Sequence, residues 1–197
     1  MYKNAPALNL RMTVYCALFT AFIIVGGFIS IPIPVSPVPI VLSDFFVMVT
    51  GLFLGFKYGV ISTTLYLALG AIGLPVFAGG TAGLAILFGP RGGYLFGFLL
   101  MVACIGLITA KKKPTMITHL IALVVGNIIL YLIGVPWLKM IMNLSWAAAI
   151  AAGLAPFIIG TVIKIAVAIT LGRVLLPKFR QTMTSISAQQ TDVDEEE

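Results

Sequence analysis

The sequence predicts an all-α membrane protein: six transmembrane helices with irregular extracellular loops that cap a ligand pocket. Of its 197 residues, 60% are hydrophobic and only 9% are charged, whereas soluble domains carry about 25% charged residues. The mean hydropathy of +1.14 leaves no room for a separate soluble domain. We therefore interpret the net charge of +6 as a signal of membrane topology. The expected partner is a lipid bilayer, and no nucleic-acid partner is expected.

Apolar runs between glycine- and proline-rich breaks define the six predicted spans. The first five approach the length of about 20 residues that a bilayer requires, although the second and third are short and meet in a tight hairpin at Gly55–Gly59. The sixth is longer, and Gly153, Pro156 and Gly160 are expected to bend or break it. The spans run approximately over 10–30, 40–56, 58–72, 92–110, 115–133 and 145–176.

The distribution of Lys and Arg predicts the orientation of these spans. Cytoplasmic loops of membrane proteins carry an excess of basic residues. With a cytoplasmic N-terminus, only Arg91 and Lys139 fall outside, and both termini of this multi-pass cell-membrane protein are cytoplasmic. Residues 1–182 form the single domain, and the acidic segment 183–197 is expected to be a disordered tail. The cytoplasmic set is Lys3, Arg11, Lys57, Lys111, Lys112, Lys113, Arg173, Lys178 and Arg180.

Three irregular segments share the outer face in this topology. Alternating prolines force residues 31–39 into a stiff, extended path that can lie across a pocket as a lid. Residues 70–97 contain many glycines and an unpaired Arg91, and irregular backbone is tolerated at membrane depth only where it is buried or lines a cavity. Residues 134–139 are expected to form a turn with an interfacial Trp137. Together they predict an outward-facing small-molecule site.

Polar side chains within the spans are the first candidates for that site, because they are costly in a bilayer. Asp44 either offsets the helix dipole or serves the pocket. Lys164, with Thr161 one turn before it, is interpreted as a pocket donor rather than a snorkelling lysine. Arg91 either binds a carboxylate of the ligand, which suits its guanidinium, or faces the lipid headgroups at the surface. Asn127 either forms a hydrogen bond between helices or binds the ligand in the pocket.

No residue set for catalysis is found in the sequence. It contains no nucleophile–base pair, no phosphate-binding lysine loop and no metal-spaced His/Cys set, and Cys16 and Cys104 lie in apolar runs as buried packing residues. We therefore expect no enzyme activity, no metal and no cofactor. Aromatic residues such as Phe77 and Tyr94 stack on a ligand ring or belong to the interfacial belt.

Ala17 and Ala21 lie one turn apart on one face of the first predicted helix. Small residues at this spacing allow two helices to approach closely. They serve either internal packing or the docking of a partner subunit.

Several longer motifs make the sequence resemble the BioY family, the biotin-binding S components of energy-coupling factor (ECF) transporters. The resemblance covers nearly all of residues 11–176, and its block at 70–94 is long and specific. The motifs are Pro32-Ile33-Pro34, Pro37-Val38-Pro39, the segments 52–55, 66–77 and 89–95, Gly134-Val135-Pro136-Trp137-Leu138, and Pro156-Phe157 with Lys164.

The resemblance implies a six-helix S-component fold with a biotin pocket on the outer side. It also implies a partner module of one transmembrane coupling protein and two cytoplasmic ATPases. Only these partner subunits would use ATP. It implies that Ala17 and Ala21 contact the coupling protein and that Arg91 belongs to the pocket. The candidate ligand-binding residues are Arg91, Lys164, Thr161, Asp44, Asn127, Phe77, Gly79 and Tyr94.

The sequence departs from the family at one position of the last helix. The family pattern is Asp-x-x-Lys, but Thr161 stands where the acid is expected, three residues before Lys164. A threonine brings no charge to offset the lysine, and we hypothesise that Asp44 supplies it; otherwise Lys164 meets the ligand carboxylate. The predicted function is biotin capture for ATP-driven uptake, with an S component for another vitamin or a small membrane enzyme as alternatives.

Overall fold

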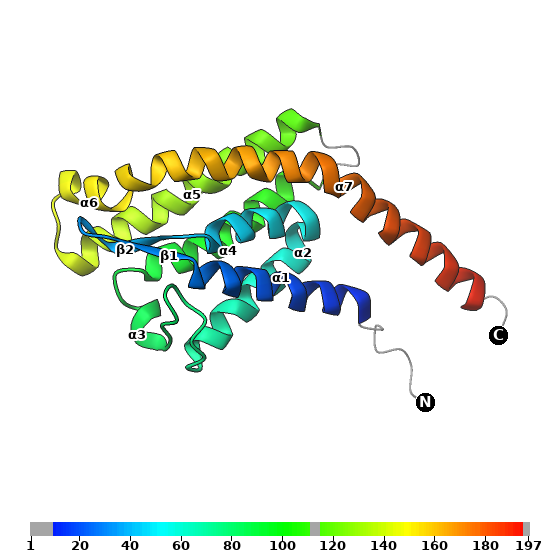
Figure 1. Cartoon of the computed structure of the whole chain (residues 1–197), viewed down its shortest axis with the longest axis horizontal. Coiled ribbons are helices and arrows are strands. Elements are labelled where there is room, and N and C mark those ends of the chain that lie inside the picture. The colour runs from blue at the N-terminus through cyan, green and yellow to red at the C-terminus, as the bar shows by residue number, and fades with distance from the viewer. Residues whose placement is uncertain (1–9, 111–114, 195–197) are drawn as a thin grey trace.

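The computed structural model describes residues 10–110 and 115–194, with the side chains of Leu10, Arg180 and 182–194 excluded. Its long helices lie side by side as a bundle, with both termini at one end and β1, β2, α3 and α6 at the other (Figure 1). The elements are α1 (Leu10–Phe28), β1 (Ser30–Ile33), β2 (Ser36–Val41), α2 (Ser43–Ala71), α3 (Leu84–Leu87), α4 (Gly92–Ile108), α5 (Met116–Met142), α6 (Trp146–Gly153), the 3-10 turn η1 (Ala155–Phe157) and α7 (Ile158–Asp194).

Four helical stretches are long and apolar enough to cross a membrane: Arg11–Phe28, Ser43–Ala71, Met116–Met142 and Trp146–Phe179. The apolar α4, Gly92–Ile108, is shorter. Large apolar side chains on the outside of the bundle are exposed, among them Leu132 at 66% and Ile159 at 75%. Such a surface is compatible with lipid rather than with water.

The predicted hairpin between the second and third spans is present within α2. Gly55 has φ 69° and ψ −164°, a backbone conformation outside the helical region. A β-carbon on Gly59 would lie 3.7 Å from the Cα of Gly51, whereas residues eight apart in a straight helix are separated by about 12 Å. The two arms of α2, 43–54 and 56–71, therefore run back along each other.

The proline-rich segment is extended, as predicted, and forms an antiparallel pair of strands. Ser30 pairs with Val41, Ile31 with Ile40 and Ile33 with Ser36, with an irregularity between Ile31 and Ile33. Pro32 lies at this irregularity, and a proline cannot donate a hydrogen bond to a ladder.

The prediction of a turn over residues 134–139 is wrong, because α5 continues to Met142 with Pro136 inside it. Tertiary packing explains the continuous helix. Trp137 Nε1 donates to the Gly89 carbonyl oxygen over 3.0 Å, and Leu138 is fully buried. These contacts offset the cost of a proline in a helix, which is about 3 kcal/mol.

The last predicted span is broken where expected at Gly153 and Pro156, between α6 and α7. Gly160, also expected to bend it, lies within α7. The same helix continues to Asp194, through most of the segment 183–197 that the sequence predicts to be disordered. No glycine or proline follows Pro177 to end the helix. Glu195–Glu197 lie outside the described residues.

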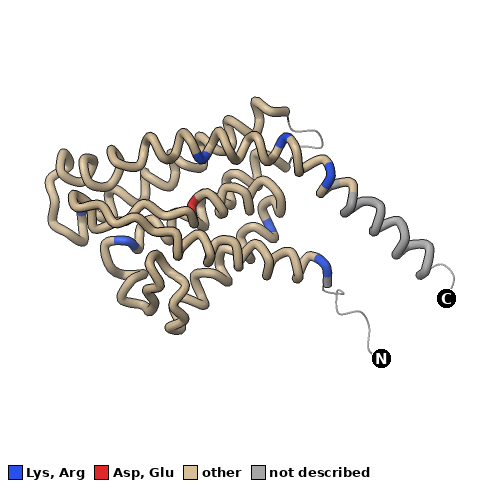
Figure 2. The backbone as a smooth tube through the Cα atoms, in the orientation of Figure 1, with Lys and Arg blue, Asp and Glu red and all other residues tan. Residues whose placement is uncertain are grey.

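Charged residues are distributed unevenly along the bundle. Figure 2 shows Lys and Arg gathered mainly at the end that holds the termini, and an acidic residue inside the bundle. Of the residues used to predict the topology, Lys3 and Lys111 to Lys113 lie outside the described residues.

Candidate functional site

Two adjoining hollows beside β2 form one chamber at the end of the bundle opposite the termini. We call them the Arg91 hollow, of about 390 Å³, and the Lys164 hollow, of about 360 Å³. The residues that line both hollows are Val38, Pro39, Val41, Tyr94 and Phe98.

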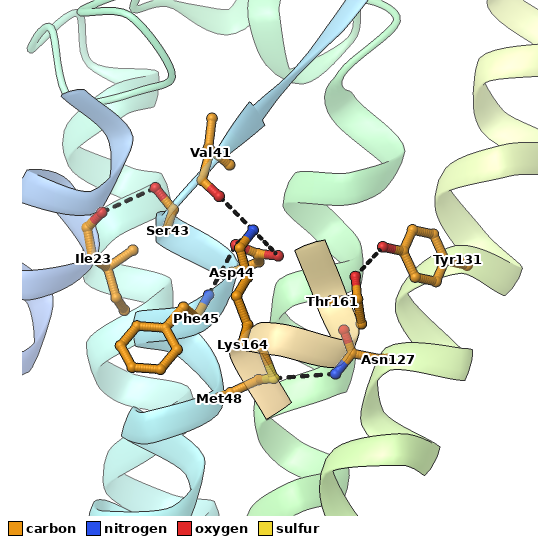
Figure 3. A network of polar contacts seen from close by, with 10 residues as sticks. All are labelled: Ile23, Val41, Ser43, Asp44, Phe45, Met48, Asn127, Tyr131, Thr161 and Lys164. Atoms are coloured by element: carbon orange, nitrogen blue, oxygen red, sulfur yellow. Dashed lines mark hydrogen bonds and ion pairs between the residues drawn. The ribbon is translucent and has the colours of Figure 1, made fainter. Parts of the chain in front are cut away.

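Lys164 of α7 is fully occupied by contacts with α2 and β2 (Figure 3). Its Nζ lies 2.8 Å from Asp44 Oδ1 and 2.9 Å from Oδ2, and it donates to the Val41 carbonyl oxygen over 2.6 Å. The two side chains are only 13% and 11% exposed. Asp44 Oδ1 also accepts from the Phe45 backbone N–H at the start of α2. The compensating charge predicted for Lys164 is thus present in Asp44.

Thr161 does not face the chamber directly. Its hydroxyl lies 2.6 Å from the hydroxyl of Tyr131, and Tyr131 lines the Lys164 hollow. Thr161 therefore acts on the chamber wall through a second residue, rather than as part of the wall.

Asn127 links two helices. Its Nδ2 donates to the Leu123 carbonyl oxygen over 2.8 Å and to Met48 Sδ of α2 over 3.1 Å. The residue is 3% exposed and does not line either hollow. Its Oδ1 has no hydrogen-bond partner among the described residues. The contact with Met48 favours the interhelical interpretation, and a ligand role stays a prediction.

Arg91 lines the hollow that bears its name and precedes α4. Its Nε donates to the Pro37 carbonyl oxygen of β2 over 3.2 Å. Within the part of the chain that the structure describes, it has no ion pair. In contrast to Lys164, the charge of Arg91 is therefore not balanced by a carboxylate of the described residues.

Phe77 and Tyr94 are part of the chamber wall. Phe77 is 1% exposed and packs edge to face on Tyr66 with ring centroids 5.5 Å apart. Its ring occupies the space that a β-carbon on Gly70 would need, so Gly70 permits this packing. Tyr94 donates its hydroxyl to the Gly153 carbonyl oxygen over 2.7 Å, which ties α4 to the break before α7.

Gly79 supports the wall without lining it. It has φ +70°, and its N–H donates to the Gly27 carbonyl oxygen over 3.0 Å. This bond holds the loop after α2 against the end of α1. The contribution of Gly79 is therefore to the position of its neighbour Ala78, which does line the Arg91 hollow.

Sequence reasoning did not select several residues of the wall. Phe157 borders the Lys164 hollow, and its place directly after Pro156 in the broken span is the signal that could have found it. Ser43 and Tyr66 line the Arg91 hollow from the two arms of α2. They meet only because α2 folds back at Gly55, a proximity that single-helix spacing does not reveal.

Ala17 and Ala21 lie away from the chamber, exposed on α1. This exposure favours docking of a partner over internal packing, and the docking role stays a prediction. Cys16 on the same helix is buried as predicted, whereas Cys104 of α4 is only partly buried, and both are free thiols. Among the described residues, no group of three His, Cys, Asp or Glu side chains could hold a metal ion.

Comparison with known proteins agrees with this arrangement of elements. The sequence model of the BioY family matches residues 1–181. The chain belongs to the BioY family. It is 43% identical over 159 residues to the biotin transporter BioY of Thermotoga maritima, covering 81% of this chain and 92% of that protein. It is 40% identical over 153 residues to the probable biotin transporter BioY of Pyrococcus horikoshii, covering 78% of this chain and 88% of that protein.

The fold also matches a solved structure. The S-component for biotin from an ECF-type ABC transporter superposes with a TM-score of 0.79 at 35% identity, covering 87% of this chain and 94% of that one. Members of the BioY family and these relatives are transporters, not enzymes. This chain is accordingly a membrane protein of the transporter class.

Proposed function

We propose that this BioY-family chain is the S component that captures biotin outside the cell and delivers it to an ECF transporter for ATP-driven uptake. The observation that carries the proposal is the chamber, in which separate hollows are bordered by a lysine–aspartate pair and by an arginine that has no ion pair among the described residues. Biotin likewise has a carboxylate at one end and a ureido ring at the other. The chamber wall between them is mostly apolar and aromatic, which suits the bicyclic ring and the aliphatic chain.

In this proposal Arg91 binds the carboxylate. A guanidinium without an acidic partner can form charge-assisted hydrogen bonds to a carboxylate in a fork geometry. Lys164 suits the carboxylate less well, because Asp44 already neutralises its charge at 2.8 Å. Phe77 and Tyr94 pack against the rest of the ligand, with Gly79 supporting the loop.

The ureido group lies at the Lys164 hollow. The Asp44 carboxylate accepts hydrogen bonds from the ureido N–H groups, and Lys164 holds this carboxylate in place through its own contacts with Asp44 and Val41. Thr161 contributes by orienting the Tyr131 hydroxyl, which it contacts at 2.6 Å. Asn127 keeps α5 beside α2 behind this group through its contact with Met48.

The same proposal includes six membrane crossings with both termini in the cytoplasm of the cell. The two arms of α2 each count as one crossing, as do α1, α4, α5 and the stretch from α6 through α7. β1 and β2 then cap the chamber from outside. The partners are a transmembrane coupling protein and two cytoplasmic ATPases, and the chain itself needs no cofactor.

Direct binding of labelled biotin to the purified chain tests the proposal. We expect saturable binding of one biotin per chain, displaced by unlabelled biotin, and biotin detected by mass spectrometry in the purified protein. Displacement by a different vitamin, with no binding of biotin, would instead support an S component for that vitamin.

A further inference from the structure

A third hollow, which we call the outer hollow, adjoins the chamber at Arg91. It has an open volume of about 520 Å³. Ile86 and Arg91 line both this hollow and the Arg91 hollow, so the two are neighbours across these side chains. The residues that line the outer hollow are Pro37, Thr81, Ala85, Ile86, Gly89, Pro90 and Arg91.

Fixed backbone holds Arg91 at this boundary. Its Nε bonds to the Pro37 carbonyl oxygen at 3.2 Å. The preceding turn is held by Trp137 Nε1 and by the Gly92 N–H, both of which donate to the Gly89 carbonyl oxygen at 3.0 Å. A carboxyl group bound to Arg91 therefore lies where the Arg91 hollow and the outer hollow meet.

Most side chains that line the outer hollow are small, and Arg91 is the charged one among them. Ala85 and Gly89 leave space, and the Thr81 hydroxyl already donates to the Ala78 carbonyl oxygen over 3.0 Å. By contrast, the Lys164 hollow at the other end is bordered by the large side chains of Tyr131 and Phe157. Extra atoms are accommodated more easily beyond the carboxyl end of a ligand than beyond the ring end.

We propose that the outer hollow binds groups joined to the carboxyl end of the ligand, so that the protein also binds carboxyl-amidated biotin such as biotinyl-lysine. This inference rests on the proposed function and extends it to a second class of substrate. The amide carbonyl still accepts a hydrogen bond from Arg91, while the attached group continues into the outer hollow. Loss of the carboxylate charge weakens this bond, because charge-assisted hydrogen bonds are about twice as strong as neutral ones.

The test is displacement of labelled biotin from the purified full-length chain by three compounds: biotin, biotinyl-lysine, and biotin substituted on a ureido nitrogen. We expect biotinyl-lysine to displace the label at a concentration about tenfold higher than biotin, whereas the ureido-substituted compound is weaker by about a thousandfold. If biotinyl-lysine displaces no better than the ureido-substituted compound, the inference is overturned. If biotin itself does not bind, the proposed function fails instead.

A variant that fills the outer hollow makes the assignment specific. Ala85→Phe adds a ring to an exposed position of α3. We expect this variant to weaken the binding of biotinyl-lysine by a further factor of about ten, while the affinity for biotin changes by less than about twofold. The matched control is Leu84→Phe, because Leu84 is 58% exposed and does not line the outer hollow. Equal effects of Ala85→Phe on both ligands would contradict the proposal. If this variant is not recovered, displacement from the unmodified chain decides the question.

Discussion

The two cations of the chamber differ in their electrostatic state but share one structural role. Lys164 is paired with Asp44, whereas Arg91 has no ion pair among the described residues. Each also donates to a carbonyl oxygen of β2, Arg91 to Pro37 and Lys164 to Val41. The strand that lines both hollows is therefore held near both of its ends by side chains from other elements. Ligand binding at either cation acts directly on a residue that positions β2.

Removal of the Arg91 side chain tests the carboxylate assignment. A hydrogen bond to a charged group contributes about 1.5–3 kcal/mol, so Arg91→Ala is expected to weaken biotin binding by about tenfold or more. Equilibrium binding of labelled biotin to the purified chain measures this. The control is Lys139→Ala, because Lys139 lies over the Trp146 ring at 5.2 Å and outside the chamber. Unchanged affinity of Arg91→Ala would place the carboxylate elsewhere.

The effects of substituting Asp44 and Lys164 on the stability of the fold are expected to be strongly coupled. Loss of one partner leaves the other charge buried and uncompensated, which costs about 3–5 kcal/mol. Asp44→Asn and Lys164→Met should each lower the thermal midpoint of the detergent-solubilised chain markedly. The double variant should lose much less than the sum of the two, because it leaves no isolated charge. Simple additivity of the two losses would show that the ion pair is not formed in solution.

At the scale of elements, one glycine determines the path of α2. Gly55 adopts φ 69° and ψ −164° between two helical arms. This turn brings Ser43 and Tyr66 to the same hollow. The chamber therefore depends on a backbone conformation that glycine adopts readily and other residues do not.

Substitution of Gly55 separates conformational strain from steric conflict. A β-carbon on Gly55 would meet no atom within 4 Å, so the effect of Gly55→Ala comes from its positive φ. We expect this variant to destabilise the fold by about 1–3 kcal/mol. Gly160→Ala is the matched control, because its β-carbon also meets nothing within 4 Å and Gly160 lies inside α7. The control should be neutral or slightly stabilising in thermal unfolding, and equal losses in both variants would refute the strain argument.

The sequence predicted features whose cause is local and missed those whose cause is tertiary. The hairpin at Gly55, the extended proline segment and the break at Pro156 follow from glycine and proline geometry. The continuation of α5 through Pro136 depends on contacts with Gly89 and neighbouring residues that are far away in sequence. Within the site, scarcity of charge was enough to pair Asp44 with Lys164. No sequence signal indicated that Thr161 reaches the chamber only through Tyr131.

At the scale of the whole molecule, the chamber and the exposed face of α1 are separate surfaces. The chamber lies near β2, at the end opposite the termini (Figure 1). Ala17 and Ala21 are exposed on α1, next to large exposed apolar residues such as Val14 and Leu18. A small-residue pair within an apolar surface permits close approach of a second membrane helix. The proposed biotin capture and the docking predicted for Ala17 and Ala21 therefore use separate surfaces, and we expect that each can be altered without the other.

A bulky residue on this face of α1 should separate assembly from biotin binding. Ala17→Trp removes the close approach that a partner helix needs, while Ala17 makes no part of the chamber wall. We expect the variant to bind labelled biotin normally but to lose co-purification with the coupling protein and the two ATPases when all four subunits are expressed together. Val162→Trp is the control, because Val162 is 61% exposed on α7 and introduces the same bulk on another face. If Ala17→Trp and Val162→Trp assemble equally well, the docking surface lies elsewhere on the bundle. If Ala17→Trp loses biotin binding as well, the two surfaces are not independent.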